Sequence, residues 1–342
     1  MTEQLLHSVS ICGRVILDLH ALNNEGSEGN QLNTRQVYIV TGQGRKPLPA
    51  HVNAISGDML KHIQAEHFRR LAQHYRFPLS QGASLGNANR INWDFKRVAG
   101  REISDTEKDE QLMDRIITTC ALTDVAGTLV TRRNKSTPRK SLVEFGWTVG
   151  IPEVTKTESY LHTKYVADSG KEDQDNNGDN LGQNLFHRPA SSGVYAFVCH
   201  IEVARVGYND IAQRYPAGLS EEERTHRSRA LLESVLYTFL QLDGAHRNTQ
   251  APHVADFEGI ITTSSSVAPA PAFSPLHDEY RMHIERISTA LKVLHPNAIT
   301  MHLFDSLGSF TEAMSELAAD ARPYRLPEFK TEGTAREDTR DR

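Results

Sequence analysis

The segment that most constrains the fold is residues 193–207, GVYAFVCHIEVARVG, a long run of strand-forming residues. Val, Ile, Phe and Tyr favour strands because their branched or aromatic side chains pack well on a pleated surface. The run predicts a long strand, so the chain is expected to fold around a sheet.

The segments before this strand predict two further strands and a helix. Residues 8–19 alternate between apolar and polar positions, which predicts a strand, and residues 36–41 predict a short one. Residues 20–35 are rich in Asn and Gly and are expected to form a loop. Residues 56–76 predict a helix that Pro78 ends. The apolar residues expected to face the core are Val9, Ile11, Val15 and Leu17 in the first strand and Leu60, Ile63, Phe68, Leu71 and Tyr75 in the helix.

The pattern after residue 207 returns to a helix and a strand. Ser220 and Glu223 have the spacing of a capping box, which predicts a helix to about Leu242. Residues 255–263 predict the next strand. The remaining expected elements are a linker at 264–275, helices at 278–294 and 306–320, and a short strand at 299–304. The order predicts an α+β fold with a βαββαβ core, ferredoxin-like or RRM-like, which hosts many functions.

Composition is that of a soluble globular protein. Hydrophobic residues make up 38% of the 342 residues and charged residues 24%. No run of about 18 apolar residues predicts a membrane span, and the first residues do not resemble a signal peptide. Three widely spaced cysteines are expected to be buried thiols, which fits a reducing cytoplasm.

Three polar segments interrupt the core pattern. Residues 132–140 are basic and are expected to form an exposed loop, which faces target DNA or a partner, or is simply solvated. Residues 150–192 are rich in Asp, Asn and Gly and predict a long excursion from the core. Residues 328–342 mix both charges with few apolar residues and predict a disordered tail.

Common catalytic motifs are absent from the sequence. It contains no Walker loop, no GxGxxG after a strand, no HExxH and no GxSxG. His62 and His67 are five residues apart and would lie on different faces of their helix, so neither they nor the cysteines predict a metal site. Asp58 is expected to complement the helix dipole, although a nuclease carboxylate is the alternative. We therefore expect no catalytic residue, no metal and no cofactor.

The segment HVNAISGDMLKHIQAEHF, residues 51–68, could bind phosphate. Gly57 would let the backbone approach a ligand at the start of the helix, where amides favour anions. Lys61 lies one turn further on, and Arg45 and Lys46 precede the segment in a loop. The alternative is an ordinary junction between a loop and a helix.

The same segment carries a resemblance to a known family. VNAISGDMLKH, together with Thr34-Arg35-Gln36, closely resembles the DevR-type backbone subunit of type I CRISPR (Cascade) interference complexes, of the repeat-associated RNA-binding superfamily. The resemblance continues more loosely through His200 and Glu202 to the turn at residues 244–247, and so covers most of residues 5–263.

The resemblance implies an RRM-like palm, a helical insertion and a β-hairpin thumb. The palm would be residues 5–77, 141–150 and 193–263, the insertion 78–140 and the thumb 151–192, followed by a helical extension at 264–327. Copies of such subunits stack along the guide RNA, and each thumb interrupts pairing between guide and target. The implied partners are guide RNA (crRNA), the target DNA strand through pairing, other copies of the chain and other subunits of the complex, with no membrane.

The resemblance also suggests site residues. A guide of arbitrary sequence must be held by its phosphates, because its base edges pair with the target. Residues suited to this are Arg35, Arg45, Lys46, Ser56, Gly57, Lys61, His246 and Arg247. Those that would wedge against bases, or else anchor the hairpin, are Leu161, Tyr165, Leu185 and Phe186. Those that could face DNA are Arg132, Arg133, Lys135, Arg139 and Lys140.

Two other functions are weighed. An RNA endonuclease like the related subunits of type III complexes would need an aspartate in the loop after the first strand, but that loop offers only Glu25 and Glu28. A transcription regulator would need a helix-turn-helix with a basic recognition helix, and no such pattern is evident. The sequence therefore favours an RNA-binding subunit without catalysis.

Overall fold

The computed structural model describes residues 4–42, 47–94, 97–98, 101–104, 106–132, 135–165, 183–243, 245 and 250–329. The strands of the main sheet are β2 (Ser8–His20), β3 (Asn24–Glu28), β4 (Gln31–Thr34), β5 (Gln36–Thr41), β6 (Leu48–Ile55), β11 (Val143–Phe145), β12 (Thr148–Tyr165), β13 (Gln183–Ile201), β14 (His253–Ser264) and β15 (Ile299–Phe304). The other strands are β1 (Gln4–Leu6), β7 (Arg97–Val98), β8 (Arg101–Glu102), β9 (Thr128–Arg132), β10 (Lys135–Arg139) and β16 (Ala321–Pro323). The helices are α1 (Gly57–His74), α2 (Gln81–Ser84), η1 (Arg90–Asp94), α3 (Asp109–Thr119), α4 (Ala121–Ala126), η2 (Val203–Arg205), α5 (Glu221–Leu240), α6 (Tyr280–Leu294) and α7 (Leu307–Asp320).

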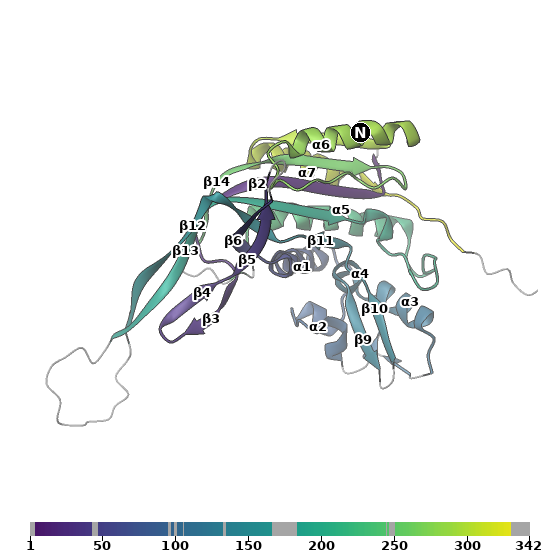
Figure 1. The fold of residues 1–342 in the computed structure, drawn as a ribbon. Coiled ribbons are helices and arrows are strands. Elements are labelled where there is room, and N and C mark those ends of the chain that lie inside the picture. Colours follow the sequence, from purple (N-terminus) through teal and green to yellow (C-terminus); the bar gives the residue numbers. More distant parts are fainter. Residues whose placement is uncertain are drawn as a thin grey trace, which may run out of the picture.

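The centre of the molecule is an antiparallel sheet with helices on both faces. Four strands lie in the order β14, β2, β13, β11, and every neighbouring pair is antiparallel. Helices α1, α5 and α7 pack on one face, and α6 covers the other through Tyr280 and Ile284 (Figure 1). The fold is therefore a mixed α/β arrangement, as predicted, and Tyr75 is the one residue of the expected α1 face that is largely exposed.

Two facing glycines allow the aromatic core to approach the sheet closely. Gly13 of β2 and Gly259 of β14 are paired in register. Phe197, Phe257 and Phe304 stack in sequence beside them, with ring centroids 5.3 Å apart. A Cβ on Gly259 would lie 2.4 Å from Phe304, so only glycine leaves room for this stack.

Two segments expected to be loops are β-hairpins. Residues 20–35 contain β3 and β4, which pair with each other, and Gln31 of β4 also pairs with His187 of β13. Residues 132–140 lie largely in the hairpin formed by β9 and β10. Both predictions were wrong because cross-strand hydrogen bonds stabilise polar segments that have low strand propensity by themselves.

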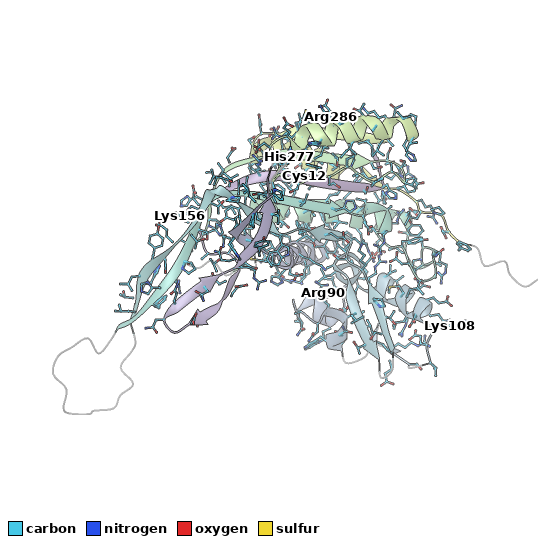
Figure 2. All side chains as sticks on the ribbon, viewed as in Figure 1. Cys12, Arg90, Lys108, Lys156, His277 and Arg286 are labelled. Carbon is cyan, nitrogen blue, oxygen red and sulfur yellow. The ribbon has the colours of Figure 1, made fainter. Side chains whose placement is uncertain are left out.

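The excursion at residues 150–192 is a long β-hairpin where the structure describes it. Strands β12 and β13 pair from Thr155 and Gly193 out to Tyr165 and Gln183. The hairpin and the insertion extend from the sheet in different directions, with Lys156 on the hairpin and Lys108 on the insertion (Figure 2). The expected disordered tail at 328–342 falls almost entirely outside the described residues. Among the described helices, none is long and apolar enough to cross a membrane.

Arg139 is a correction to the expected DNA-facing group. Its side chain is 0% exposed and forms a 2.5 Å ion pair with Asp124 of α4. Asp124 also accepts from Arg227 of α5 at 3.2 Å. The charge of Arg139 therefore links β10 to α4, and through Asp124 to α5, in the interior and is not exposed to DNA, because a buried guanidinium requires a buried carboxylate.

Burial of His20 predicts a loss of stability in acid. The side chain is 0% exposed and lies edge-on to Tyr195, and burial lowers its pKa to about 4. The unfolded chain would bind a proton near pH 6.5, whereas the folded chain would not, so stability falls as pH drops from about 6.5 to 4. We expect His20 to contribute about 3 kcal/mol to this loss. Urea unfolding at a series of pH values gives the free energy of unfolding as a function of pH. Its slope between about pH 4 and 6.5 should be smaller in His20→Gln than in the wild type, and an equal slope would contradict the assignment.

Candidate nucleic-acid interface

The start of α1 is held in place by the segments around it. Ser56 is the N-cap residue: its Oγ accepts from the Met59 N–H at 3.3 Å and donates to Asn23 Oδ1 at 2.8 Å. The first amides of a helix have no intrahelical partner and favour an anion. The connection between β2 and β3 thus fixes an α1 terminus with an acidic Asp58 in its first turn, as the sequence predicted.

Gly57 lies against the backbone of β11. A Cβ at this position would lie 2.2 Å from the backbone oxygen of Phe145 and 3.3 Å from that of Gly146. Glycine is therefore required here by the close approach of α1 to β11 of the same chain. This contact sets the position of α1 against the sheet.

A cleft of about 340 Å³ lies beside the α1 terminus. Its lining includes Ser56, Lys61, Lys140, Glu144 and Trp147. Burial lowers the pKa of Lys61, while Asp58 and Glu144 oppose that shift. Among the described residues, Lys61 forms no ion pair within 4.0 Å, so its ammonium group is available to a phosphate.

Lys140 also lines this cleft and is paired. Its Nζ is 2.5 Å from Glu144, and this hydrogen bond is the main reason that the pKa of Lys140 is raised. The lysine was expected to face DNA, but the structure brings it to the expected guide-binding residues. A phosphate would compete with Glu144 for Lys140, since both are anions.

Arg35 joins the same region through Trp147. Its guanidinium carbon lies 5.5 Å from the Trp147 ring centroid, within the range of a cation–π contact. Its Nε is 2.5 Å from Glu25. Trp147 is 44% exposed and was missed in the sequence, where a lone tryptophan after a glycine gives no functional signal.

Comparison with known proteins identifies the family of this chain. The sequence profile of the family described as CRISPR-associated negative auto-regulator DevR/Csa2 matches residues 11–284. The chain belongs to this family. It is 24% identical over 257 residues to the CRISPR-associated protein Cas7/Csa2 1 of Saccharolobus solfataricus, covering 75% of this chain and 79% of the relative. The expected membership of a DevR-type CRISPR family is confirmed.

Two solved chains are also similar to this DevR/Csa2 protein. One comes from a CRISPR RNA-guided surveillance complex, pre-nicking, with a TM-score of 0.47 and 11% identity, covering 91% of this chain and all of that chain. The other comes from a CRISPR RNA-guided surveillance complex, with a TM-score of 0.44 and 10% identity, covering 91% and 98%.

The hairpin of this DevR/Csa2 protein carries apolar side chains on both faces. Leu161 and Leu185 are 58% and 50% exposed and share one face, because Leu161 pairs with His187. Phe186 lies on the other face, stacked on His162 at 5.8 Å and under Arg188 at 4.9 Å. The two leucines are therefore exposed, whereas Phe186 contacts His162 and Arg188 on the other face.

Several expected site residues fall outside the description. Arg45, Lys46, Arg133, His246 and Arg247 lie outside the described residues. The side chains of Tyr165, Arg132 and Lys135 also lie outside them. Their roles remain predictions. His200, part of the family resemblance, shares a hydrogen bond with Ser10 at 2.9 Å and therefore stabilises the sheet.

Proposed function

We propose that this DevR/Csa2 protein is a backbone subunit of a type I CRISPR effector complex that holds guide RNA by its phosphates. The observation that carries the proposal is the cleft at the α1 terminus, where helix amides, Lys61 and Lys140 meet beside an exposed tryptophan. Amides and lysines recognise phosphate without reading base identity, which suits a guide of arbitrary sequence. Trp147 adds a flat face for a base or ribose.

The palm in this proposal is RRM-like. Strands β14, β2, β13 and β11 with helices α1 and α5 have the βαββαβ connectivity of ferredoxin-like folds. The guide would run past the α1 end of this palm, the β12–β13 hairpin would serve as the thumb, and Leu161 and Leu185 would press against bases. Other copies of the chain, other subunits and the target strand would complete the cytoplasmic assembly. The subunit would bind RNA without cleaving it.

The test is RNA binding by charge-matched variants. Lys61→Ala should weaken binding of a labelled guide about tenfold at low salt, because one phosphate contact is lost. The slope of the logarithm of the binding constant against the logarithm of salt concentration should become smaller by about one. Lys292→Ala removes the same charge from an exposed position on α6 and should leave affinity unchanged. The protein should be co-expressed with its companion genes and a repeat-spacer array, and the bound RNA sequenced. Recovery of protein without guide RNA, or equal weakening by both variants, would contradict the proposal.

A further inference from the structure

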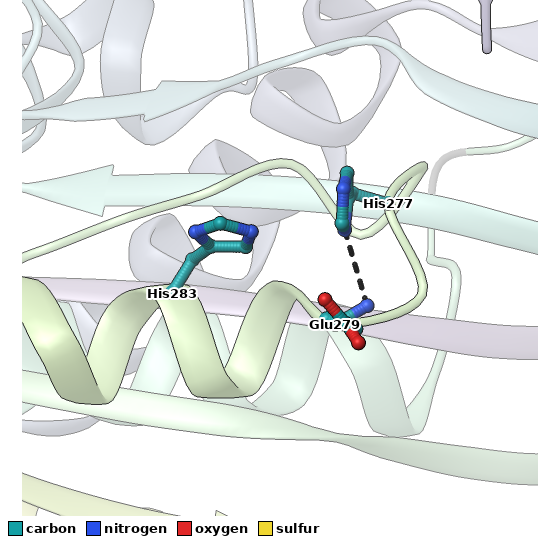
Figure 3. A group of neighbouring side chains, drawn as sticks. All are labelled: His277, Glu279 and His283. Atoms are coloured by element: carbon teal, nitrogen blue, oxygen red, sulfur yellow. Dashed lines mark hydrogen bonds between the residues drawn. The ribbon is translucent and has the colours of Figure 1, made fainter. Parts of the chain in front are cut away.

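Two imidazoles and one carboxylate gather at the start of α6, on the face of the sheet opposite the α1 cleft. His277 and Glu279 come from the turn that precedes the helix, and His283 comes from its first turn (Figure 3). One ligand atom from each residue lies within 4.8 Å of the other two. Two histidine nitrogens with one carboxylate oxygen form a donor set that Zn²⁺ takes in proteins.

The backbone around this cluster is fixed by hydrogen bonds. The His277 N–H donates to Ser274 O, and the Tyr280 N–H donates to His277 O, both at 3.1 Å. The His283 N–H donates to Glu279 O at 3.1 Å. Tyr280 and Ile284 are buried against the sheet, so the three donors project from a rigid base.

Aromatic contacts also restrain the two imidazoles. The ring of His283 stacks on Phe273 with centroids 4.6 Å apart, and it meets the ring of His277 edge-on at 4.9 Å. Phe273 in turn packs against the cluster of Cys12, Ile260 and Tyr280. Little side-chain freedom therefore remains to be lost when a metal binds.

We propose that His277, Glu279 and His283 form a binding site for Zn²⁺, with water as the fourth ligand. Zinc bonds of about 2.0–2.2 Å place tetrahedral ligands roughly 3.3 Å apart, so the partly exposed side chains must close by about 1.5 Å or less. His277 Nδ1 now accepts the Glu279 N–H at 3.2 Å, and the metal takes over this lone pair. The Glu279 carboxylate offsets the positive end of the helix dipole, which would otherwise repel a cation.

The bound ion links the turn at residues 273–279 to α6 and so stabilises the packing of α6 on this face of the sheet. The test uses the full chain without an added histidine tag, stripped with a chelator and titrated with Zn²⁺ against a chromogenic competitor. Wild-type protein should take up one tight equivalent, and its melting temperature should rise on binding. Co²⁺ in place of Zn²⁺ should give the strong visible absorption of a tetrahedral site.

The double variant His277→Asn, His283→Asn should bind Zn²⁺ at least tenfold more weakly than the wild type. Its melting temperature should not rise when Zn²⁺ is added. Its melting temperature in chelator should match the wild type; if it does not fold, Glu279→Gln, at an exposed position, carries the same test. His302→Asn changes an exposed histidine on β15 and should bind as the wild type does. The site would be overturned if the wild type bound no Zn²⁺ with a dissociation constant below millimolar. It would also be overturned if the double variant, or Glu279→Gln where the double variant does not fold, bound Zn²⁺ as tightly as the wild type.

Discussion

Replacement of Asp124 by alanine is expected to destabilise this DevR/Csa2 protein by about 3–5 kcal/mol. Asp124 is 0% exposed and pairs with two guanidinium groups that are also 0% exposed, those of Arg139 at 2.5 Å and Arg227 at 3.2 Å. It also accepts the backbone N–H of Gly207 at 3.1 Å. Its removal would leave two buried cations without their shared counter-ion, and that cost exceeds the value of an ordinary ion pair.

A matched control is available on the same arginine. Asp210 pairs with Arg139 at 3.0 Å, but its side chain is 39% exposed, so water can replace it. Asp210 also forms a bidentate pair with Arg205, so Asp210→Ala should cost about 1–2 kcal/mol, still clearly less than Asp124→Ala. The free energy of unfolding in urea, measured for both variants, distinguishes the buried pair from the exposed one. Equal losses would show that burial of Asp124 has no special energetic weight.

The Gly57→Ala variant is expected to lose about 1–3 kcal/mol and most of its affinity for guide RNA. The added methyl group would lie 2.2 Å from the backbone oxygen of Phe145, and a methyl group has no rotamer that could relieve this contact. The first turn of α1 must then move away from β11. Because Ser56 and Lys61 are on or beside that turn, the cleft that they share with Lys140 would change shape.

Gly308→Ala provides the control for this substitution. Gly308 lies in α7, and its nearest neighbour to an added methyl would be Ser306 Oγ at 3.7 Å, an ordinary contact. Alanine there should stabilise the chain by up to about 1 kcal/mol, because it reduces the freedom of the unfolded state. Thermal unfolding and guide-RNA titration of both variants test the contrast. If Gly57→Ala folds and binds guide RNA as tightly as the wild type, the position of α1 against β11 does not control RNA binding.

Much of the fold could be predicted from local sequence patterns. The alternation in residues 8–19 matched β2, whose Val9 and Ile11 are fully buried. Ser220 is the N-cap of α5 as predicted, although the Glu223 side chain bonds Arg227 and does not complete a capping box. These predictions succeeded because the period of apolar residues is set by the geometry of one strand or one helix. The hairpins β3–β4 and β9–β10 were missed because their stability comes from pairing partners.

The candidate site was only partly predictable for the same reason. The string at residues 53–61 identified the α1 terminus, Ser56 and Lys61 from sequence alone. Lys140 and Trp147 could not be placed beside them, since they lie about 80 residues further along the chain and reach the cleft only through the pairing of β11 and β12 within the sheet. Arg139, next to Lys140 in sequence, points into the interior instead.

By itself the sequence determined the helices α1, α5, α6 and α7, the strands β2, β5, β14 and β15, the buried cysteines and the family, because each depends on residue type and spacing along the chain. The tertiary structure decided which charges are buried, what Gly57 approaches and which histidines meet at the start of α6. These depend on strand register and on the packing of layers, where a shift of one residue moves a side chain to the other face. The local pattern of apolar residues does not specify the strand register of polar residues. That register is set only when the strands and helices pack together.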